Sequence, residues 1–346
     1  MNSFQGINYE FNFIILESNA YILKAMKDKI IEHIIQKTGI PHIVELLARG
    51  LTGSELNSLL LEVFNQRQKN IAPALLLQQY QVNRFVHPAE ADMIGLLTRE
   101  LEILRLLKGR HFQPIELSPA AQWGSCSLLA PVDQKKVISA TRNTEILADA
   151  TNSLALHIAD LKKSGKIAPS GSTPSSTVDD YLRYCTVHRH IRTQELRGKG
   201  HTAHFKIGCL VSAGKDTGSY RFECASLQEH FQTLDHLFRE VFGIQKIRFK
   251  LQKREGYNNC DLLLEAVLDH LAATTTLEII HETPPSNNYY KGIQYKMIIE
   301  AGDREMEIAD GGFVDWTQQL LGNNKERLLI SGFGLELLYK IQNGLI

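Results

Sequence analysis

The sequence predicts an α+β fold in which a mostly antiparallel sheet is flanked by helices and preceded by a helical module. The N-terminal part carries apolar side chains at helical spacing. Beyond residue 180, short strand-like runs dominate, and helices fall between them without the regular strand–helix alternation of a parallel sheet. Residues 165–177, rich in Gly, Pro, Ser and Thr, are too polar to pack and predict a flexible loop or linker. We therefore expect two domains, residues 1–82 and residues 83–346.

The N-terminal module, residues 1–82, is expected to contain several helices. Isoleucines at helical spacing between Ile30 and Ile35 predict one helix, which Gly39 and Pro41 end. A second helix follows residues 52–55, which have the spacing of a capping box, and its apolar positions predict one buried face. No residue of this module indicates catalysis, so it is a docking domain for a protein partner or a brace for the core.

The core is expected to alternate helices with strands. Residues 88–107 predict a helix capped by Gly109, residues 132–141 a strand or hairpin, and residues 149–163 a second helix. Further strands are expected at residues 181–191, 204–212, 247–251, 294–300 and 328–332, and further helices at residues 227–242, 261–271 and 335–341.

Composition narrows the class of protein. Charged residues make up 22% of the 346 residues and apolar ones 43%, which is typical of soluble globular chains. The 38 basic side chains balance 38 acidic ones, so no surplus attracts nucleic acid. No apolar run is long enough for a membrane helix, and residues 1–10 lack the features of a signal peptide, so we expect a cytoplasmic protein. The five cysteines form no C-x-x-C pair and are expected to be reduced thiols.

A basic, glycine-containing segment, residues 188–201, joins two strand-like runs. Arginine side chains and exposed backbone N–H groups there suit a phosphate group, although a solvated hairpin tip has the same composition. A zinc site at Cys185, His188 and His190 is not expected. In a strand the two histidines share one face and the cysteine points to the other.

Three glycine- or tyrosine-marked segments follow. Tyr289 and Tyr290 precede a strand, where their hydroxyl groups suit a small polar ligand or, equally, an interface. Residues 311–315 and 331–336 are expected to be turns, and the second leads into an apolar helix whose N-terminus would hold an anion or pack tightly.

The order of six short motifs resembles the catalytic core of class II aminoacyl-tRNA synthetases, and most closely that of histidyl-tRNA synthetase. The resemblance covers about residues 85–346 and implies a class II synthetase-like antiparallel sheet flanked by helices, in a chain that forms a homodimer. The motifs are residues 146–151, 184–194, 204–208, 289–293, 311–315 and 332–336.

The resemblance implies a nucleotide site and an amino-acid site. Arg189 matches the arginine that grips the α-phosphate of ATP, and Phe205 matches the aromatic residue that stacks on adenine, so ATP with Mg²⁺ is the implied cofactor. The residues that match the amino-acid pocket are Asp149 and Thr151 for the amino group, Tyr289 and Tyr290 beside the histidine side chain, and Asp315 in the family's Gly-Gly-Arg-Tyr-Asp turn.

Four departures from the family pattern argue against ordinary aminoacylation. Ile191 replaces a glutamate that orients the adenine end of ATP, and Phe313 replaces the arginine of the Gly-Gly-Arg-Tyr-Asp turn. Pro285 and Leu337 stand where the resemblance places two arginines, of which the second neutralises the γ-phosphate. Since one lost charged contact to a phosphoryl group costs several kcal/mol, adenylate formation should fall by orders of magnitude.

Three functions remain open at this stage. The first is a catalytically degenerate paralogue that binds an amino acid or similar ligand and serves as a regulatory subunit, like the regulatory subunit of ATP phosphoribosyltransferase. We expect no anticodon-binding domain and no tRNA partner in that case. The second is an ATP-dependent ligase for a non-tRNA acceptor, with phosphate charge supplied by other basic residues, and the third is a dimeric scaffold without ligand. The basic residues considered are Arg192, Arg197, Lys199 and Arg254, of which Arg254 is expected in a solvated turn.

Overall fold

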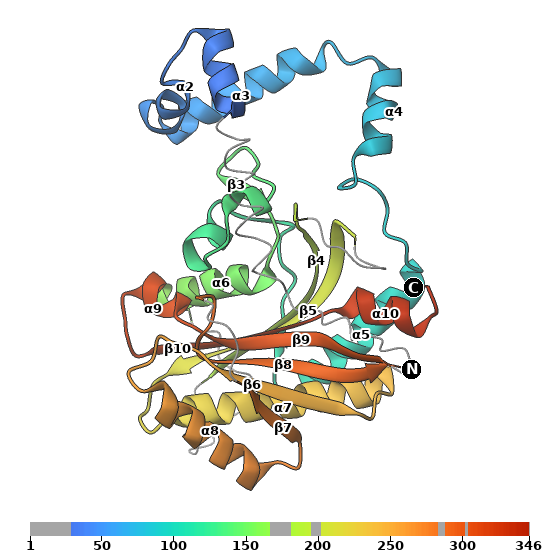
Figure 1. Ribbon diagram of the computed structural model, residues 1–346, viewed down its shortest axis with the longest axis vertical. Helices are drawn as coiled ribbons and strands as arrows, with labels where there is room; N and C mark the ends of the chain where they lie inside the picture. The colour runs from blue at the N-terminus through green and yellow to red at the C-terminus, as the bar shows by residue number, and fades with distance from the viewer. Residues whose placement is uncertain (1–28, 167–180, 195–201, 283–287, 302–303, 346) are drawn as a thin grey trace, which may run out of the picture. The chain divides into compact units, whose positions relative to one another are not determined.

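The structure, a computed structural model, describes residues 29–166, 181–194, 202–282, 288–301 and 304–345 (Figure 1). The chain divides into two compact units. One comprises residues 1–73 with residues 141–143, and the other comprises residues 74–140 and 144–346. Most of the expected linker, residues 167–177, lies outside the described residues. No helix of the described ranges is long and apolar enough to cross a membrane.

The first unit is helical in the part that the structure describes. Residues 29–38 form a helix that ends at Gly39, which adopts a left-handed φ of 69°. The next helices are α2 (Ile43–Glu45), continued by a π-helical turn (Leu46–Gly50), and α3 (Gly53–Gln68).

The predicted capping box of α3 is confirmed. The hydroxyl of Thr52 accepts from the backbone N–H of Glu55 at 3.3 Å, and the Glu55 carboxylate accepts from the backbone N–H of Thr52 at 2.7 Å. The expected buried face is wrong, because α3 has no buried residue and Phe64 is 56% exposed. A helical period shows which side chains share a face but not whether anything packs on it.

The second unit contains an eight-stranded sheet that is antiparallel except at its two edges, and the predicted α+β class is confirmed. Its strand order is β1-β4-β5-β10-β9-β8-β6-β7, and only the edge pairs β1–β4 and β6–β7 are parallel. The strands are β1 (Gln113–Pro114), β4 (Leu182–Ile191), β5 (His204–Lys215), β6 (Ile247–Lys253), β7 (Glu278–Glu282), β8 (Lys291–Ala301), β9 (Arg304–Val314) and β10 (Glu326–Phe333).

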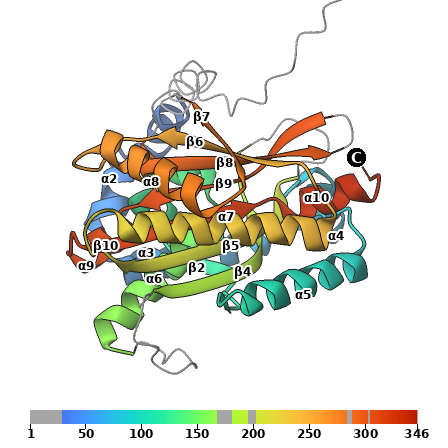
Figure 2. The ribbon, with the colours of Figure 1, turned by 90° about the horizontal axis from the view of Figure 1, so that it is seen from below.

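Helices cover both faces of this sheet. The helices of the unit are α4 (Pro73–Val82, which begins at the boundary), α5 (Met93–Gly109), α6 (Ala150–Ser164), α7 (Arg221–Phe242), α8 (Cys260–Thr274), α9 (Trp316–Leu321) and α10 (Leu335–Gln342). Helices α7 and α8 lie along one face, over a core that includes the stacked rings of Phe231 and Phe249 (Figure 2). Helix α6 packs on the other face, where Leu154 and Ile158 meet Val211 and Ile330.

The sequence predictions for three segments of this unit need correction. The hairpin or strand expected at residues 132–141 is limited to an isolated antiparallel bridge between Ser139 and Glu145, after a short 3₁₀ turn (Gln134–Lys136). The small two-stranded sheet pairs β2 (Ala120–Gln122) with β3 (Thr144–Ile146). The glycine pair at 311–312 belongs to β9 and does not form a turn. Helix α5 also starts later than expected, at Met93, because the Asp92 carboxylate caps it.

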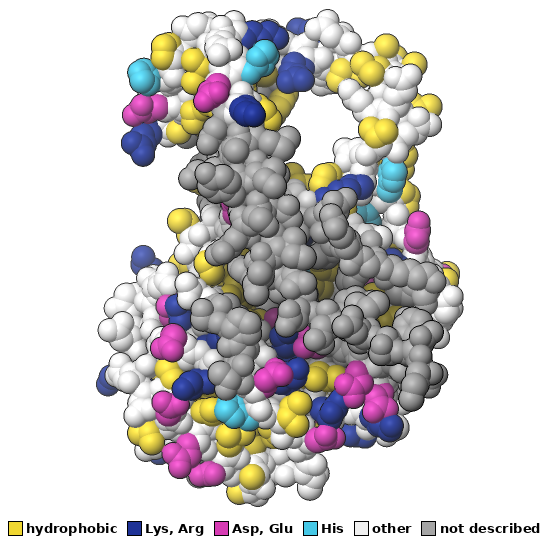
Figure 3. Space-filling model, in the orientation of Figure 1, with side chains coloured by type: hydrophobic (Ala, Val, Ile, Leu, Met, Phe, Trp, Pro, Cys, Tyr) yellow, Lys and Arg dark blue, Asp and Glu magenta, His cyan; other side chains and the backbone are white. Residues whose placement is uncertain are grey.

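Charged side chains are interspersed over the surface of this unit. On the face seen in Figure 3, basic and acidic groups alternate and neither sign dominates the coloured part. Ion pairs across β6, β7, β8 and β9 explain the mixture. They include Lys246–Glu300, Arg248–Glu305, Lys250–Glu282 and Lys296–Glu307.

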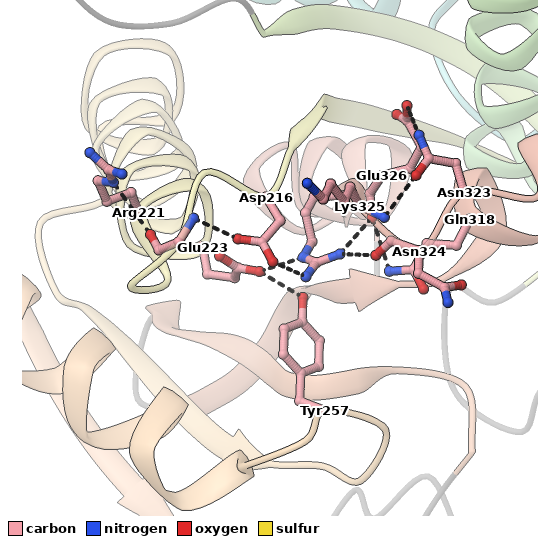
Figure 4. Close-up of polar contacts among 11 residues, drawn as sticks. Asp216, Arg221, Glu223, Tyr257, Gln318, Asn323, Asn324, Lys325 and Glu326 are labelled. Atoms are coloured by element: carbon pink, nitrogen blue, oxygen red, sulfur yellow. Dashed lines mark hydrogen bonds and ion pairs between the residues drawn. The ribbon is translucent and has the colours of Figure 1, made fainter.

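A half-buried cluster of ion pairs fixes the start of α7 against the start of β10. The Arg327 guanidinium donates to Glu223 at 2.8 Å and to Asp216 at 2.7 Å. The hydroxyl of Tyr257 donates to the same Glu223 oxygen at 3.1 Å, and Figure 4 shows Tyr257, Glu223 and Asp216 converging from three segments. Because Glu223 is 1% exposed, its charge needs this compensation, and the cluster is structural.

A second polar group is fully buried between α7 and the sheet. The imidazole of His230 shares hydrogen bonds with Ser212 at 2.9 Å and Ser331 at 2.6 Å, and Tyr295 donates to Ser331 at 2.5 Å. A neutral imidazole has one donor and one acceptor nitrogen, which is what two hydroxyl neighbours satisfy. Burial lowers the pKa of His230 to about 3.

Substituting His230 with Gln is expected to reduce the acid sensitivity of folding. With a pKa near 3 when folded and an ordinary value of 6.5, His230 takes up its proton first in the unfolded chain. Its contribution is therefore complete above about pH 6.5 and is lost as pH falls toward 3, by up to about 1.4 kcal/mol per pH unit. Urea unfolding at several pH values measures this slope, which should be shallower in the variant.

The matched control for this experiment is His236→Gln, on the same helix at a half-buried position. It should keep the wild-type slope. An unchanged slope in His230→Gln would show that the buried imidazole does not govern the acid limb of stability.

Candidate functional site

Asp149 forms one end of the candidate site, at the N-terminus of α6. One carboxylate oxygen accepts from the backbone N–H of Thr151 at 2.9 Å and from the Thr151 hydroxyl at 2.7 Å. The other oxygen accepts from the Tyr289 hydroxyl at 2.9 Å. The helix cap therefore fixes the direction of a carboxylate that contacts a residue 140 positions away in the sequence.

Tyr289 and Tyr290 form the middle of the site, as the chain enters β8. Their ring centroids lie 4.7 Å apart at 65°, and Trp316 supports the Tyr289 ring from 5.7 Å. The Tyr290 hydroxyl donates to Asp310 at 3.0 Å. Burial, together with the neighbouring carboxylates, raises the pKa of both tyrosines well above its usual range, so both hydroxyls are neutral donors.

Asp310, on β9, forms the other end and was missed by the sequence analysis. The Asp310 side chain is exposed to water. Desolvation by the surrounding protein nevertheless raises the pKa of its carboxyl group, and the negative charge of Asp149 raises it further. The glycine pair that follows Asp310 resembled a turn and so hid the strand alternation that puts this side chain on the α6 face.

Gly312 allows the tyrosine pair to lie against the sheet. A Cβ atom at Gly312 would stand 2.6 Å from the backbone oxygen of Ile293 and 2.7 Å from the Tyr290 ring. Both distances are below van der Waals contact, so only glycine fits under the ring.

Arg192 and Phe205 lie on the same side of the sheet as this cluster. The Arg192 guanidinium donates to the backbone oxygen of Ala148 at 3.0 Å and stands 5.5 Å from the centre of the Phe205 ring. The charge of Arg192 acts on Tyr289 and Asp310. Lys296 also acts on Asp310 and Arg254 on Tyr290, so several cations lie near the two carboxylates.

His190 lies behind this group and is 1% exposed. Its Nε2 atom accepts from the backbone N–H of Ala150 at 3.3 Å, which leaves the proton on Nδ1. Nδ1 has no hydrogen-bond partner among the described residues. Desolvation, and then the charge of Arg192, holds the pKa of His190 well below its usual range, so the ring is neutral.

Arg189 is not brought to this cluster. Its guanidinium pairs with Glu336 at 2.8 Å and contacts the His204 ring at 3.0 Å. The β4–β5 register sets Phe205 opposite His190, so Arg189 and Phe205 project from opposite faces of the sheet. Glu336 is 1% exposed and is compensated by Arg189 together with Lys340.

Asp315 also lies apart from the two carboxylates. It is at the start of α9, where it accepts from Gln319 at 2.8 Å and stands 3.9 Å from the Lys291 ammonium. Phe313, which replaces a family arginine, is buried on the opposite face, in the core beneath α7 and α8. Pro285, Arg197 and Lys199 lie outside the described residues.

The expectation of a solvated turn at Arg254 is wrong. Arg254 is 6% exposed and donates to the side chains of Gln294 and Gln252, at 2.6 and 3.1 Å. Desolvation lowers its pKa. Long-range partners, invisible in a local run of charged residues, decide its burial.

The described residues offer no metal site and a surface groove whose charged side chains are already paired. Within the described residues, no group of three or more His, Cys, Asp or Glu side chains is arranged to hold a metal ion. A surface groove of about 390 Å³ is lined by Asp235, Arg239, Lys246 and Glu300, but these four side chains already pair with one another.

The sheet topology, with α6 and the tyrosine-bearing entry to β8 on one face, is that of the class II aminoacyl-tRNA synthetase core. No protein-family model and no curated protein sequence matches the chain. Among solved structures, apo histidyl-tRNA synthetase from Staphylococcus aureus matches with a TM-score of 0.53 and 10% identity, over 75% of this chain and 71% of that chain. At this identity the likeness establishes the fold.

Two further structures agree. A histidine–tRNA ligase subunit from Alicyclobacillus acidocaldarius matches with a TM-score of 0.51 and 11% identity, over 75% of this chain and 96% of that chain. A chain from Aeropyrum pernix described as a threonyl-tRNA synthetase has a TM-score of 0.53 and 10% identity, over 70% of this chain and 58% of that chain. This chain therefore spans less than two thirds of that relative. The histidyl-synthetase-like fold inferred from the motif order is confirmed.

Substituting Gly312 with Ala is expected to displace Tyr290 and to destabilise the protein by about 1–3 kcal/mol, the usual cost of overpacking. The control is Gly332→Ala on the adjacent strand, where a Cβ would meet only Ile207, at 3.7 Å. The control should lose no stability. Urea unfolding of both variants measures the difference, and equal losses would contradict the role assigned to Gly312.

Proposed function

We propose that this chain is a catalytically degenerate, histidyl-tRNA synthetase-like paralogue that binds an amino acid or similar small ligand and acts as a regulatory or binding subunit. The observation that carries the proposal is the hydrogen-bonded series Asp149–Tyr289–Tyr290–Asp310. It joins two carboxylates through two aromatic rings on the face that α6 covers. An amino group fits the first carboxylate, and the rings provide an apolar surface for the rest of the ligand.

Each residue has a defined part in this proposal. Asp149 accepts hydrogen bonds from the ammonium group of the ligand, and Thr151 holds that carboxylate in place. Arg192, whose charge acts on Tyr289 and Asp310, pairs with a carboxylate of the ligand. Tyr289 and Tyr290 line the space between the two ends of the site.

Loss of aminoacylation is supported by where the cations lie. Arg189, which the resemblance assigns to the α-phosphate of ATP, instead forms an ion pair with Glu336 on the opposite face of the sheet. Leu337 and Pro285 stand where the resemblance expects two arginines. Each missing charged contact to the phosphates raises the barrier to adenylate formation by several kcal/mol.

A second candidate is an ATP-dependent ligase for a non-tRNA acceptor. It is favoured by the pairing of Arg192 with Phe205, since an aromatic ring beside an arginine suits adenine and a phosphate. ATP would then bind with Mg²⁺ through these two residues. One cation supplies little of the charge that three phosphates carry, and we therefore prefer the first proposal.

Exposed apolar side chains support two proposals about protein partners. Helix α5 leaves Met93, Ile94, Leu97 and Leu101 exposed, which supports a homodimer through this helix. Residues 1–82 are proposed to dock a protein partner, in keeping with the exposed apolar side chains of α3. A dimer that binds no small molecule would favour the scaffold alternative.

Substituting Asp149 with Asn is expected to weaken amino-acid binding by roughly 10- to 100-fold, because a charge-assisted hydrogen bond is worth about 1.5–3 kcal/mol. Asn caps a helix as well as Asp does, so α6 should remain intact. Calorimetric titration with each amino acid, without ATP, measures the affinity. The control is Asp160→Asn, an exposed position on the same helix.

Wild-type affinity in Asp149→Asn would contradict the proposed site. Amino-acid-dependent release of pyrophosphate from ATP would instead establish the ligase. The absence of binding by any amino acid or by ATP would leave the scaffold.

A further inference from the structure

Asp149 and Asp310 differ from most acidic side chains of the sheet because they form no ion pair among the described residues. Most charged side chains on β6–β9 are ion-paired, whereas neither of these carboxylates has an ion pair among the described residues. Lys296 stands directly opposite Asp310 in the β8–β9 register, but its ammonium bonds to Glu307 at 2.7 Å. Arg192 is held by the backbone oxygen of Ala148.

Neither carboxylate is therefore compensated by a direct ion pair among the described residues. The charges of Arg192 and Lys296 act on Asp310 and that of Arg254 acts on Tyr290, but none of these cations pairs with either carboxylate. Both tyrosines are neutral. Each carboxylate keeps hydrogen-bond donors from the protein, but these supply no full positive charge. Opposite charge brought by a ligand would relieve the repulsion between the two carboxylates.

The two carboxylates are also separated in a defined way. The tyrosine rings, with centroids 4.7 Å apart, lie between them, and each hydroxyl bonds to one carboxylate. A ligand that reaches both ends must cross the two rings. It needs an apolar stem between two groups that carry positive charge.

We propose that the ligand is an α-amino acid with a second basic nitrogen, such as lysine, ornithine or arginine, bound with its α-ammonium group at Asp149 and its side-chain cation at Asp310. This inference rests on the proposed function, and it makes Asp310 the residue that determines specificity. A neutral side chain would leave the Asp310 carboxylate desolvated by the ligand and without a counter-charge. Lysine carries a four-carbon stem that would pack on the tyrosine rings.

The experiment is a calorimetric titration of the full chain with matched pairs of amino acids. Lysine is compared with norleucine, which has a similar stem without the ammonium group, and arginine with citrulline, which lacks the charge. Histidine is the fifth probe. Wild-type protein should bind the charged member of each pair at least about 10-fold more tightly, as expected for a charge-assisted hydrogen bond.

Two variants locate the effect. Asp310→Asn should remove the preference for lysine over norleucine, because lysine loses its counter-charge and norleucine no longer desolvates an unpaired carboxylate. Because Asp310 is exposed and Asn can still accept from Tyr290, this variant should keep the wild-type melting temperature. Asp149→Asn should weaken both ligands, and Asp160→Asn should weaken neither.

The outcomes separate this inference from the proposed function. Equal binding of lysine and norleucine by the wild type, or tighter binding of histidine than of lysine and arginine, would overturn the basic-ligand inference and leave an amino-acid site. A lysine preference that survives in Asp310→Asn would overturn the role of Asp310. Failure of all five probes to bind would overturn the basic-ligand inference, and failure of every other amino acid as well would overturn the proposed function.

Discussion

The candidate site depends on the close approach of the Tyr290 ring to the backbone of β9 at Gly312. Any Cβ atom at that position would occupy the space of the ring and of the adjacent strand. Tyr289 and Tyr290 are consecutive, so displacing one ring moves both hydroxyls and separates them from Asp149 and Asp310. A steric constraint at one glycine thereby sets the geometry of a site built from α6, β8 and β9.

The distribution of charge follows from a second constraint, the burial of Glu336. A carboxylate that is 1% exposed must be compensated, and Arg189 and Lys340 supply the two cations. The arginine that the family resemblance assigns to ATP therefore stabilises the fold on the opposite face. Arg192 and Lys296 act on Asp310 and Arg254 acts on Tyr290, but none of the three forms an ion pair with Asp149 or Asp310 among the described residues.

The sequence predicted the elements whose pattern is local and missed the features that depend on distant partners. The helix that Asp149 caps and the strands that carry Arg189 and Phe205 follow from residue spacing, and the structure confirms these elements. Asp310 was missed because the glycine pair after it imitated a turn. Arg254 was misjudged because its burial depends on glutamines elsewhere in the sheet. Motif order identified the fold, but only the strand register shows that Arg189 and Phe205 face opposite ways.

The register also keeps the ion pair of Arg189 separate from the candidate site. The ion pair of Arg189 with Glu336 and the series from Asp149 to Asp310 lie on different faces of one sheet, so a change in one leaves the other in place. Burial of Glu336 requires a cation, whereas nothing in the fold requires two unpaired carboxylates beside a tyrosine pair. Stability alone would favour a counter-charge there, as at Lys296 and Glu307 on the neighbouring strands. The proposed ligand would supply the counter-charge that the described part of the fold does not provide.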